Sequence, residues 1–351
     1  MGLQILILYS LVLFLLLLGW QYTGCRCSKK QSICIHIIGA LLLTLIVAFR
    51  DGSCLPDYNE YVQSYEAGGR TSGGVEPTFY LISYFAKNTG WGVMAMFFIY
   101  ALFSVSIRYY AIYKYAPYFL FSLATWASTM LLLHDMIQIR AAVASALLLI
   151  ILPLLYRRRI VPALILMMIA FFFHRSAIIF LPLLFFNTKK DYWWLWITAL
   201  GVACIINLLK INIFDIFGLT ELSQGIQLVE DDIYSLTQRD MVNIFNPYML
   251  LQIVPCLICI IRIKHIRPVF PEIGLFLKTA LTGIIIYSFS LGVVSTRLAE
   301  LLSTALIFVY PCALNWYSGK YRVILGKITI TAICLMILTN FIFWQDFISH
   351  Q

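Results

Sequence analysis

Long apolar runs separated by short polar segments make up most of this 351-residue sequence. A helix needs about 20 apolar residues to cross the hydrocarbon core of a bilayer, and about 17 are enough. Runs of this kind predict membrane-spanning helices at Leu3–Trp20, Ile33–Phe49, Gly92–Ile107, Pro117–Leu133, Ala141–Tyr156, Trp193–Leu209, Pro247–Ile261, Ile273–Val294, Leu298–Trp316 and Ile328–Trp344. Two shorter runs, Pro162–Phe173 and Ala177–Phe186, flank His174 and predict either under-length helices or a re-entrant hairpin. We therefore expect an all-α polytopic membrane protein with about twelve transmembrane helices in one domain, residues 1–351.

Composition agrees with this pattern, because 62% of the residues are hydrophobic and only 12% are charged, which excludes a soluble domain. The formal net charge of +9 does not indicate nucleic-acid binding, since Lys and Arg occur in short clusters between the apolar runs. The pairs Cys25/Cys27 and Cys256/Cys259 lack the His or second Cys pair that a zinc site requires. We expect no metal and no cofactor.

The distribution of basic residues predicts the orientation in a bacterial inner membrane, because cytoplasmic loops are enriched in Lys and Arg. The loops that we assign to the cytoplasm contain Arg26, Lys29, Lys30, Arg108, Lys114, Arg157, Arg158, Arg159, Lys189, Lys190, Arg262, Lys264, Arg267, Lys320, Arg322 and Lys327. The opposite side has about half as many, namely Arg50, Arg70, Lys87, Arg140, Arg175, Lys210, Arg239 and Arg297. Both termini are then periplasmic, and the larger periplasmic loops are 50–91, with an amphipathic piece at Pro77–Ala86, and 210–246.

Four arginines lie at or near the predicted outer ends of apolar runs: Arg50, Arg140, Arg175 and Arg297. Arginine near the depth of a bilayer is costly unless it is paired or lines a wet cavity, and its planar guanidinium suits a two-pronged contact with phosphate. Several such arginines on one face predict an anionic ligand, for which a lipid diphosphate is a candidate. The alternative is that each arginine snorkels or pairs with a nearby acid such as Asp51, Asp135 or Glu300.

Five short motifs resemble one known family in order and spacing. Arg50-Asp51-Gly52 followed by Pro56-Asp57-Tyr58 and Tyr61 is similar to the signature of EpsG-like, Wzy-type polysaccharide polymerases. The other motifs are Glu76-Pro77-x-x-Tyr80, Gln138-Ile139-Arg140-Ala141-Ala142, His174-Arg175-Ser176-Ala177 and Thr296-Arg297-Leu298-Ala299-Glu300. One departure concerns the residue after Arg140, where the family often has Gln and this chain has Ala141, so Gln138 is the candidate to supply that amide.

The resemblance implies a glycosyltransferase that moves a growing glycan from undecaprenyl diphosphate to a lipid-linked oligosaccharide repeat unit at the periplasmic face. Such reactions build O-antigen, capsule or exopolysaccharide, and a glycan chain-length regulator would be a partner together with the lipid bilayer. Arg140 and Arg297, with Arg50 or Arg175, are candidates to bind the leaving diphosphate. His174, Asp57 and Glu76 are candidates for the general base, with a preference for His174. Tyr58 and Tyr61 form either a sugar-stacking platform or an interfacial aromatic belt, and Gln138 and Glu300 complete the predicted binding site.

Two other functional classes stay open at this point. A flippase for lipid-linked glycans would also have many helices and a cationic cavity, but its charges should line a path to both faces. A membrane-bound sugar acyltransferase would take its donor from the cytoplasmic side, where the loops are short and basic.

Overall fold

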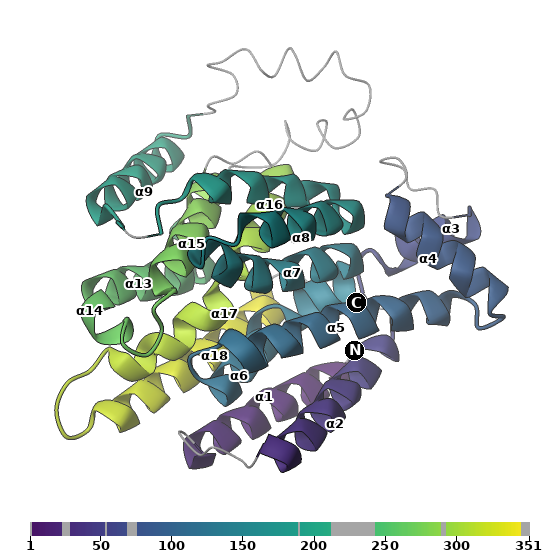
Figure 1. The fold of residues 1–351 in the computed structure, drawn as a ribbon, viewed down its shortest axis with the longest axis horizontal. Coiled ribbons are helices and arrows are strands. Elements are labelled where there is room, and N and C mark those ends of the chain that lie inside the picture. The colour runs from purple at the N-terminus through teal and green to yellow at the C-terminus, as the bar shows by residue number, and fades with distance from the viewer. Residues whose placement is uncertain are drawn as a thin grey trace.

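The computed structural model describes residues 2–22, 29–52, 55–68, 76–188, 190–211, 243–288 and 293–344, and these residues form helices and turns without a strand (Figure 1). The first half of the chain contains α1 (Gly2–Tyr22), α2 (Lys29–Ala48), α3 (Tyr58–Glu66), α4 (Pro77–Asn88), α5 (Val93–Tyr115), α6 (Phe119–Thr129), the π-helix η1 (Leu131–Ile137), α7 (Ile139–Tyr156) and α8 (Ile160–Phe173). The second half contains the 3₁₀-helix η2 (Arg175–Phe185), α9 (Trp193–Leu208), α13 (Pro247–Ile261), α14 (Ile263–Ile266), α15 (Ile273–Ser288), α16 (Val293–Ser303), α17 (Leu306–Val309), the 3₁₀-helix η3 (Tyr310–Asn315) and α18 (Arg322–Trp344). The all-α fold predicted from the apolar runs is confirmed.

Helix length and composition identify a multi-pass membrane protein. Five spans are long and apolar enough to cross a bilayer, and α6 with η1 makes a sixth if this pair, bent by 64°, is taken as one span. Six further apolar helices in the described part of the chain are shorter, at 10–17 residues. The number of about twelve crossings stays a prediction, because short helices of this kind can span a bilayer or end within it.

The helix α7 lies at the centre of the bundle and packs against α5 on one side and α8 on the other (Figure 1). The span that it forms is 78% buried within the protein, whereas the span of α1 is only 28% buried. An apolar helix that is buried on most of its surface is a core helix, and one that exposes most of its apolar surface faces lipid. Residues on α7 can therefore meet several other segments, as can those of the span Thr296–Asn315, which is 89% buried.

Two short helices, α3 and α4, lie together at one end of the bundle, where α5 begins (Figure 1). They occupy the predicted outer loop 50–91, and α4 includes the predicted amphipathic piece Pro77–Ala86. The N-terminal part of α1 is at the same end, because the Gln4 amide donates a hydrogen bond to the Asp51 carbonyl at 2.8 Å. Most of the second predicted loop, residues 212–242, lies outside the described residues.

The segment around His174 makes the predicted pair of short helices. α8 has 14 residues and η2 has 11, and His174 between them is extended, with φ −155° and ψ 115°. At 1.5 Å per residue in α8 and 2.0 Å per residue in η2, each is about 21 to 22 Å long, less than the roughly 30 Å of a bilayer core. The two helices pack against each other, so the reversal at His174 lies at one end of a helical hairpin.

Three predictions from the sequence need correction. Arg108 is not in a cytoplasmic loop, because α5 continues through Tyr115 and the Arg108 side chain is fully buried against Asp135. The predicted helix Pro117–Leu133 does not end at Leu133, since the π-helix η1 runs on to Ile137 and the break is at Gln138. The predicted helix Leu298–Trp316 does not begin after Arg297, because Arg297 lies inside α16, which begins at Val293. In each case a polar residue ended the apolar run in the sequence without ending the helix.

Candidate active site

The carboxylate of Glu76 is the meeting point of three segments that are far apart in the sequence. Arg140 Nη1, near the start of α7, lies 3.1 Å from Glu76 Oε2, and His174 Nδ1 lies 3.3 Å from Glu76 Oε1. The backbone N–H of Arg175 donates to the same Oε1 at 3.3 Å. Glu76 is the N-cap residue of α4, but its side chain does not cap that helix, and so the carboxylate is available to the other two segments.

Glu76 is held in its ionised form. Burial alone would raise the pKa of this carboxyl, but the contact with His174, the positive charge of Arg140 and the Arg175 N–H outweigh burial, and the pKa is lowered from its usual value. The Glu76 side chain is only 6% exposed, so few of its contacts are shared with solvent. A carboxylate with a lowered pKa is a weak proton acceptor near neutral pH, and it is well suited to orienting His174 and Arg140.

Arg140 lies between this carboxylate and two aromatic rings. Its guanidinium carbon is 5.2 Å from the ring centroid of Tyr61 on α3 and 5.7 Å from that of Phe79 on α4. Cation–π contacts of this kind hold the plane of a guanidinium in one orientation. Nη1 is used by Glu76, whereas the buried Nε–H has no hydrogen-bond partner in the part of the chain that the structure describes. The side chain is 17% exposed, so a further acceptor would have to reach it outside the buried Nε.

Asp57 and Arg297 belong to the same cluster. Burial raises the pKa of Asp57, and the nearby charges of Arg297 and Arg140 act in the opposite direction. Asp57 is the N-cap residue of α3 with a left-handed backbone, φ 53°, and its side chain does not bond to the N–H groups of that helix. A non-glycine residue with positive φ whose side chain leaves the helix end uncapped is typical of a functional position.

The pair Gln138 and Glu300 joins the cluster to α16. Gln138 Nε2 donates to Glu300 Oε2 at 3.1 Å, and Glu300 lies within electrostatic range of Arg297 and Asp57. Glu300 also lines a small cavity of about 30 Å³ between α13, α15 and α16, together with Tyr248, Met249, Gln252, Gly283, Tyr287, Thr296, Ala299 and Ser303. This volume has room for water but not for a sugar ring. The Gln138 amide thus faces Glu300, and its role in substrate binding stays a prediction.

Two of the predicted binding residues, Arg50 and Tyr58, make packing contacts. Arg50 donates to the Val47 carbonyl at the end of α2 at 3.0 Å, and its guanidinium carbon is 4.5 Å from the ring centroid of Phe97. Tyr58 stacks on the same Phe97 with ring centroids 5.0 Å apart. A Cβ atom on Gly52 would lie 1.9 Å from a ring carbon of Tyr58, so only glycine allows this ring to pack here. Tyr61, and not Tyr58, is the tyrosine beneath Arg140.

Sequence reasoning missed Phe79, although it quoted the neighbouring Tyr80 as part of a motif. Tyr80 is 46% exposed, whereas Phe79 is fully buried beside Arg140. The helical spacing already contained this information, because residues three apart lie on one face of a helix and Phe79 follows Glu76 by three. The remaining predicted residue, Arg175, contributes its backbone N–H to Glu76, and its side chain is exposed.

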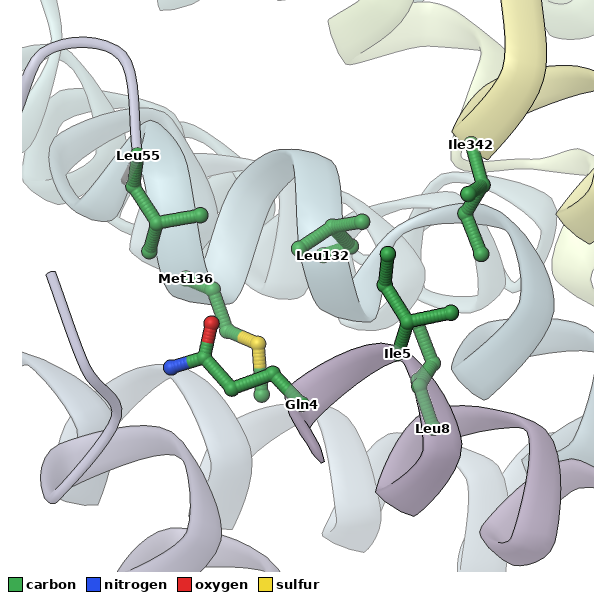
Figure 2. Close-up of a pocket in the computed structure, with 7 residues that line it drawn as sticks. All are labelled: Gln4, Ile5, Leu8, Leu55, Leu132, Met136 and Ile342. Carbon is green, nitrogen blue, oxygen red and sulfur yellow. The ribbon is translucent and has the colours of Figure 1, made fainter. Parts of the chain in front are cut away.

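A second, apolar pocket lies near the start of α1 and is shown in Figure 2. Its lining consists of Gln4, Ile5, Leu8, Leu55, Leu132, Met136 and Ile342. Gln4 is the only polar side chain among them, and its amide already donates to the Asp51 carbonyl. This pocket offers no charged group to a phosphate or a sugar, unlike the cluster around Glu76.

Comparison with known proteins agrees with the motifs that converge on this cluster. A family model described as the EpsG family matches residues 32–351, which include every candidate site residue. No curated protein and no solved structure matches the chain. Because the family model covers most of the sequence, the chain belongs to the EpsG family.

Proposed function

We propose that this protein is a polysaccharide polymerase of the Wzy type, which transfers a growing glycan from undecaprenyl diphosphate to a lipid-linked repeat unit at the periplasmic face of the bacterial inner membrane. Membership of the EpsG family supports a polysaccharide polymerase. The single observation that carries the finer proposal is the Glu76 cluster, in which Arg140, His174 and the Arg175 N–H meet one buried carboxylate beside Asp57 and Arg297.

In the proposed reaction, a hydroxyl oxygen of the acceptor sugar attacks the anomeric carbon of the donor glycan. The new C–O bond forms as the bond from that carbon to the diphosphate oxygen breaks, and the electron pair leaves with undecaprenyl diphosphate. Negative charge grows on the diphosphate, so fixed cationic donors lower the barrier. Arg140 suits this role because its guanidinium is oriented by Glu76, Tyr61 and Phe79 and its side chain is 17% exposed.

The hydroxyl proton needs an acceptor, and His174 is the best placed of the three candidates. Its Nδ1 lies 3.3 Å from the ionised Glu76 without hydrogen-bond geometry, and this negative charge favours the tautomer with the proton on Nδ1, which leaves the lone pair of Nε2 to take the proton. Glu76 itself is a weaker candidate, because its three contacts stabilise the carboxylate. Asp57, whose pKa is raised by burial, is the alternative base. Arg297, near Asp57, is the second candidate for the diphosphate.

The reaction can be tested with the purified protein reconstituted in liposomes and supplied with undecaprenyl-diphosphate-linked repeat units as the only sugar source. We expect a ladder of glycans of increasing length and one undecaprenyl diphosphate released for each linkage. No nucleotide sugar should be needed. Wild-type protein and a His174→Gln variant are compared at equal amounts of folded protein, and the variant should form less than a hundredth of the product.

Two results would overturn the proposal. Movement of repeat units across the bilayer without any new glycosidic bond would make the protein a flippase. A modified repeat unit that carries an acyl group, formed only when an acyl donor is added, would make it an acyltransferase.

A further inference from the structure

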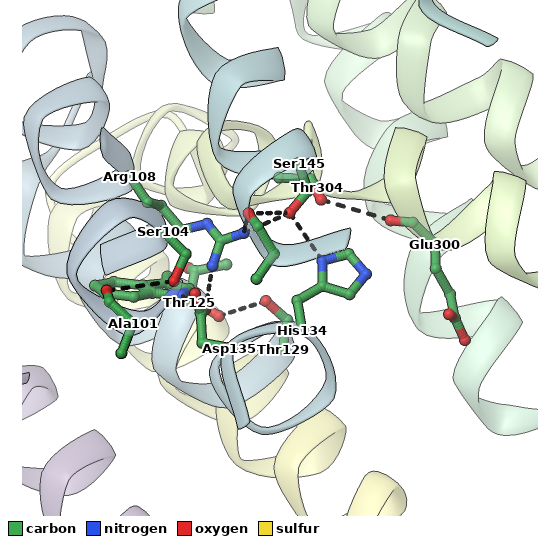
Figure 3. A network of polar contacts seen from close by, with 12 residues as sticks. Ala101, Ser104, Arg108, Thr125, Thr129, His134, Asp135, Ser145, Glu300 and Thr304 are labelled. Carbon is green, nitrogen blue, oxygen red and sulfur yellow. Dashed lines mark hydrogen bonds and ion pairs between the residues drawn. The ribbon is translucent and has the colours of Figure 1, made fainter. Parts of the chain in front are cut away.

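A second polar cluster lies deeper in the bundle, apart from Glu76, and is shown in Figure 3. Arg108 on α5 pairs with Asp135 on η1, and both side chains are 0% exposed. Trp126 Nε1 donates to the same Asp135 carboxylate at 2.9 Å, and Ser145 on α7 accepts a hydrogen bond from Arg108. His134 Nδ1 lies 3.0 Å from the Ser145 hydroxyl. The proposed chemistry uses none of these residues.

Stability alone does not account for such a cluster. Two charges taken out of water lose their hydration, and a buried ion pair can often be replaced by apolar residues of similar size without loss of stability. The cluster also leaves Arg108 Nε, Asp135 Oδ1 and His134 Nε2 buried without a hydrogen-bond partner among the described residues. A buried polar cluster with this desolvation cost is expected to define the local geometry more precisely than apolar packing would.

The geometry in question is the path of the chain immediately before Gln138 and Arg140. In η1 the backbone bonds reach back five residues, as in Asp135 N to Met130 O at 3.3 Å and Gln138 N to Leu133 O at 3.0 Å. This wide turn follows a bend of 64° between α6 and η1, and a break at Gln138 separates η1 from α7. Single turns of π-helix are rare in proteins, and those that occur are often found at functional sites.

The buried cluster joins the two sides of this break. Arg108 donates to Asp135 on η1 with Nη1, and it donates to the Ala142 carbonyl and to Ser145 on α7 with Nη2. The contact between His134 and Ser145 joins η1 to α7 a second time. Both connections therefore span Gln138, and Arg140 is the second residue after the break.

We propose that Arg108, Asp135 and Ser145 are positioning residues, which set the angle between η1 and α7 and so place Gln138 against Glu300 and Arg140 against Glu76. This inference rests on the proposed function, in which Arg140 binds the leaving diphosphate. A guanidinium displaced by about 1 Å from its productive position loses up to about a hundredfold in rate, although it still binds an anion. The cluster acts on the rate of transfer through Arg140 and does not touch the substrate.

The test compares Ser145→Ala with a matched control, Ser128→Ala, in the liposome assay. Ser128 is also a buried serine that bonds to a carbonyl of its own helix, but it lies outside the cluster. We expect Ser145→Ala to lower kcat about tenfold with KM changed less than about twofold, because the substrate contacts remain. Ser128→Ala should keep the wild-type kcat, and both variants should unfold at similar temperatures.

A double-mutant cycle with Arg140→Lys separates positioning from general damage. If Ser145 acts through Arg140, adding Ser145→Ala to Arg140→Lys should lower kcat by less than about twofold more, since the oriented guanidinium is already lost. If the two substitutions instead lower kcat by independent factors that multiply in the double variant, the inference is overturned. A wild-type kcat for Ser145→Ala would also overturn it. If Arg140→Lys alone has the wild-type rate, the diphosphate contact in the proposed function is wrong, which is a different result.

A second variant covers the case in which Ser145→Ala does not fold. Arg108→Met combined with Asp135→Leu removes both charges and fills the space with apolar side chains, a replacement that buried ion pairs often tolerate. We expect this variant to fold and to show the same loss of kcat with little change in KM. A folded double variant with the wild-type kcat would show that the ion pair does not position the site.

Discussion

Substitutions in the ion pair between Arg140 and Glu76 should change folding stability and polymerisation rate independently of each other. At 3.1 Å and an effective dielectric constant of about 20, the two charges attract each other by about 5 kcal/mol before the cost of burial is subtracted. Removing one partner of a buried pair typically costs about 3 to 5 kcal/mol of folding stability. Arg140→Ala should lie near the lower value, about 3 kcal/mol, because Glu76 keeps His174 and the Arg175 N–H.

The same substitution should lower the polymerisation rate by roughly a hundred- to a thousandfold, the usual effect of losing one oriented donor to developing negative charge. Combining Arg140→Ala with Glu76→Gln removes the buried charge that has lost its arginine, so this double variant should regain thermal stability without regaining activity. Arg157→Ala is the control, since Arg157 forms a longer pair with Glu272 at 3.5 Å and is 51% exposed. That pair should contribute less than about 1 kcal/mol, and its loss should leave the rate unchanged.

The measurements are the unfolding temperature in detergent and the initial rate of polymerisation in liposomes, on the same preparations. A double variant that regains both stability and rate would refute the reasoning, because Arg140 would then serve only to neutralise Glu76. A wild-type rate in Arg140→Ala at equal folded protein would refute the diphosphate contact directly.

Four further predictions follow from the described contacts. His174→Gln should lower the initial rate more than Asp57→Asn if His174 is the base, and the reverse order would assign the base to Asp57. Gly52→Ala should destabilise the protein by about 1 to 3 kcal/mol in thermal unfolding, because Tyr58 must move, whereas Gly201→Ala, where a Cβ meets nothing within 4 Å, should not destabilise it. The folded-state pKa of Glu76 lies below its ordinary value of 4.5, so its ionisation stabilises the fold above about pH 4.5, and this contribution is lost as the pH falls through the lowered pKa. The unfolding temperatures of wild type and Glu76→Gln should therefore converge in acid. A difference that stays constant with pH would contradict the lowered pKa of Glu76. In a Cys-free background, Glu60→Cys should react with an impermeant thiol reagent from the periplasm and Lys320→Cys only after the inner membrane is permeabilised, and the opposite pattern would reverse the predicted orientation.

Hydrophobic patterning predicted the helices well because a membrane helix is apolar over most of its length. The run Pro247–Ile261 coincides with α13, and the run Trp193–Leu209 differs from α9 by one residue. Patterning failed where a charge was buried inside a helix. Arg108 ended its run at Ile107, yet α5 continues because Asp135, on another segment, compensates the charge. A partner that is 27 residues away in the sequence cannot be identified from periodicity.

The motifs predicted which residues the fold brings together, but they could not assign roles to them. Residues 57, 61, 76, 138, 140, 174, 297 and 300 come together, as their joint resemblance to one family implied. The sequence could not show that Glu76 holds His174 and Arg140 in place, or that Arg50 packs on Phe97, because both depend on tertiary contacts. The sequence also could not predict that η1 is a π-helix, since an apolar π-helix and an apolar α-helix have nearly the same composition.

The close packing of Gly52 against Tyr58 has a consequence for how related sequences should vary. The first motif contains two kinds of residue under different constraints: Tyr58 and Arg50 pack on Phe97 with Gly52 beneath Tyr58, whereas Asp57 and Tyr61 lie beside Arg140, although the Tyr61 ring also meets the edge of Phe97. In an alignment of the family, substitutions within the first group should covary with position 97 and be compensated by changes in side-chain volume. Substitutions in the second group should instead accompany changes at position 140 and in the glycan that is made. The two groups of residues, although they alternate within one short motif, should therefore evolve at different rates.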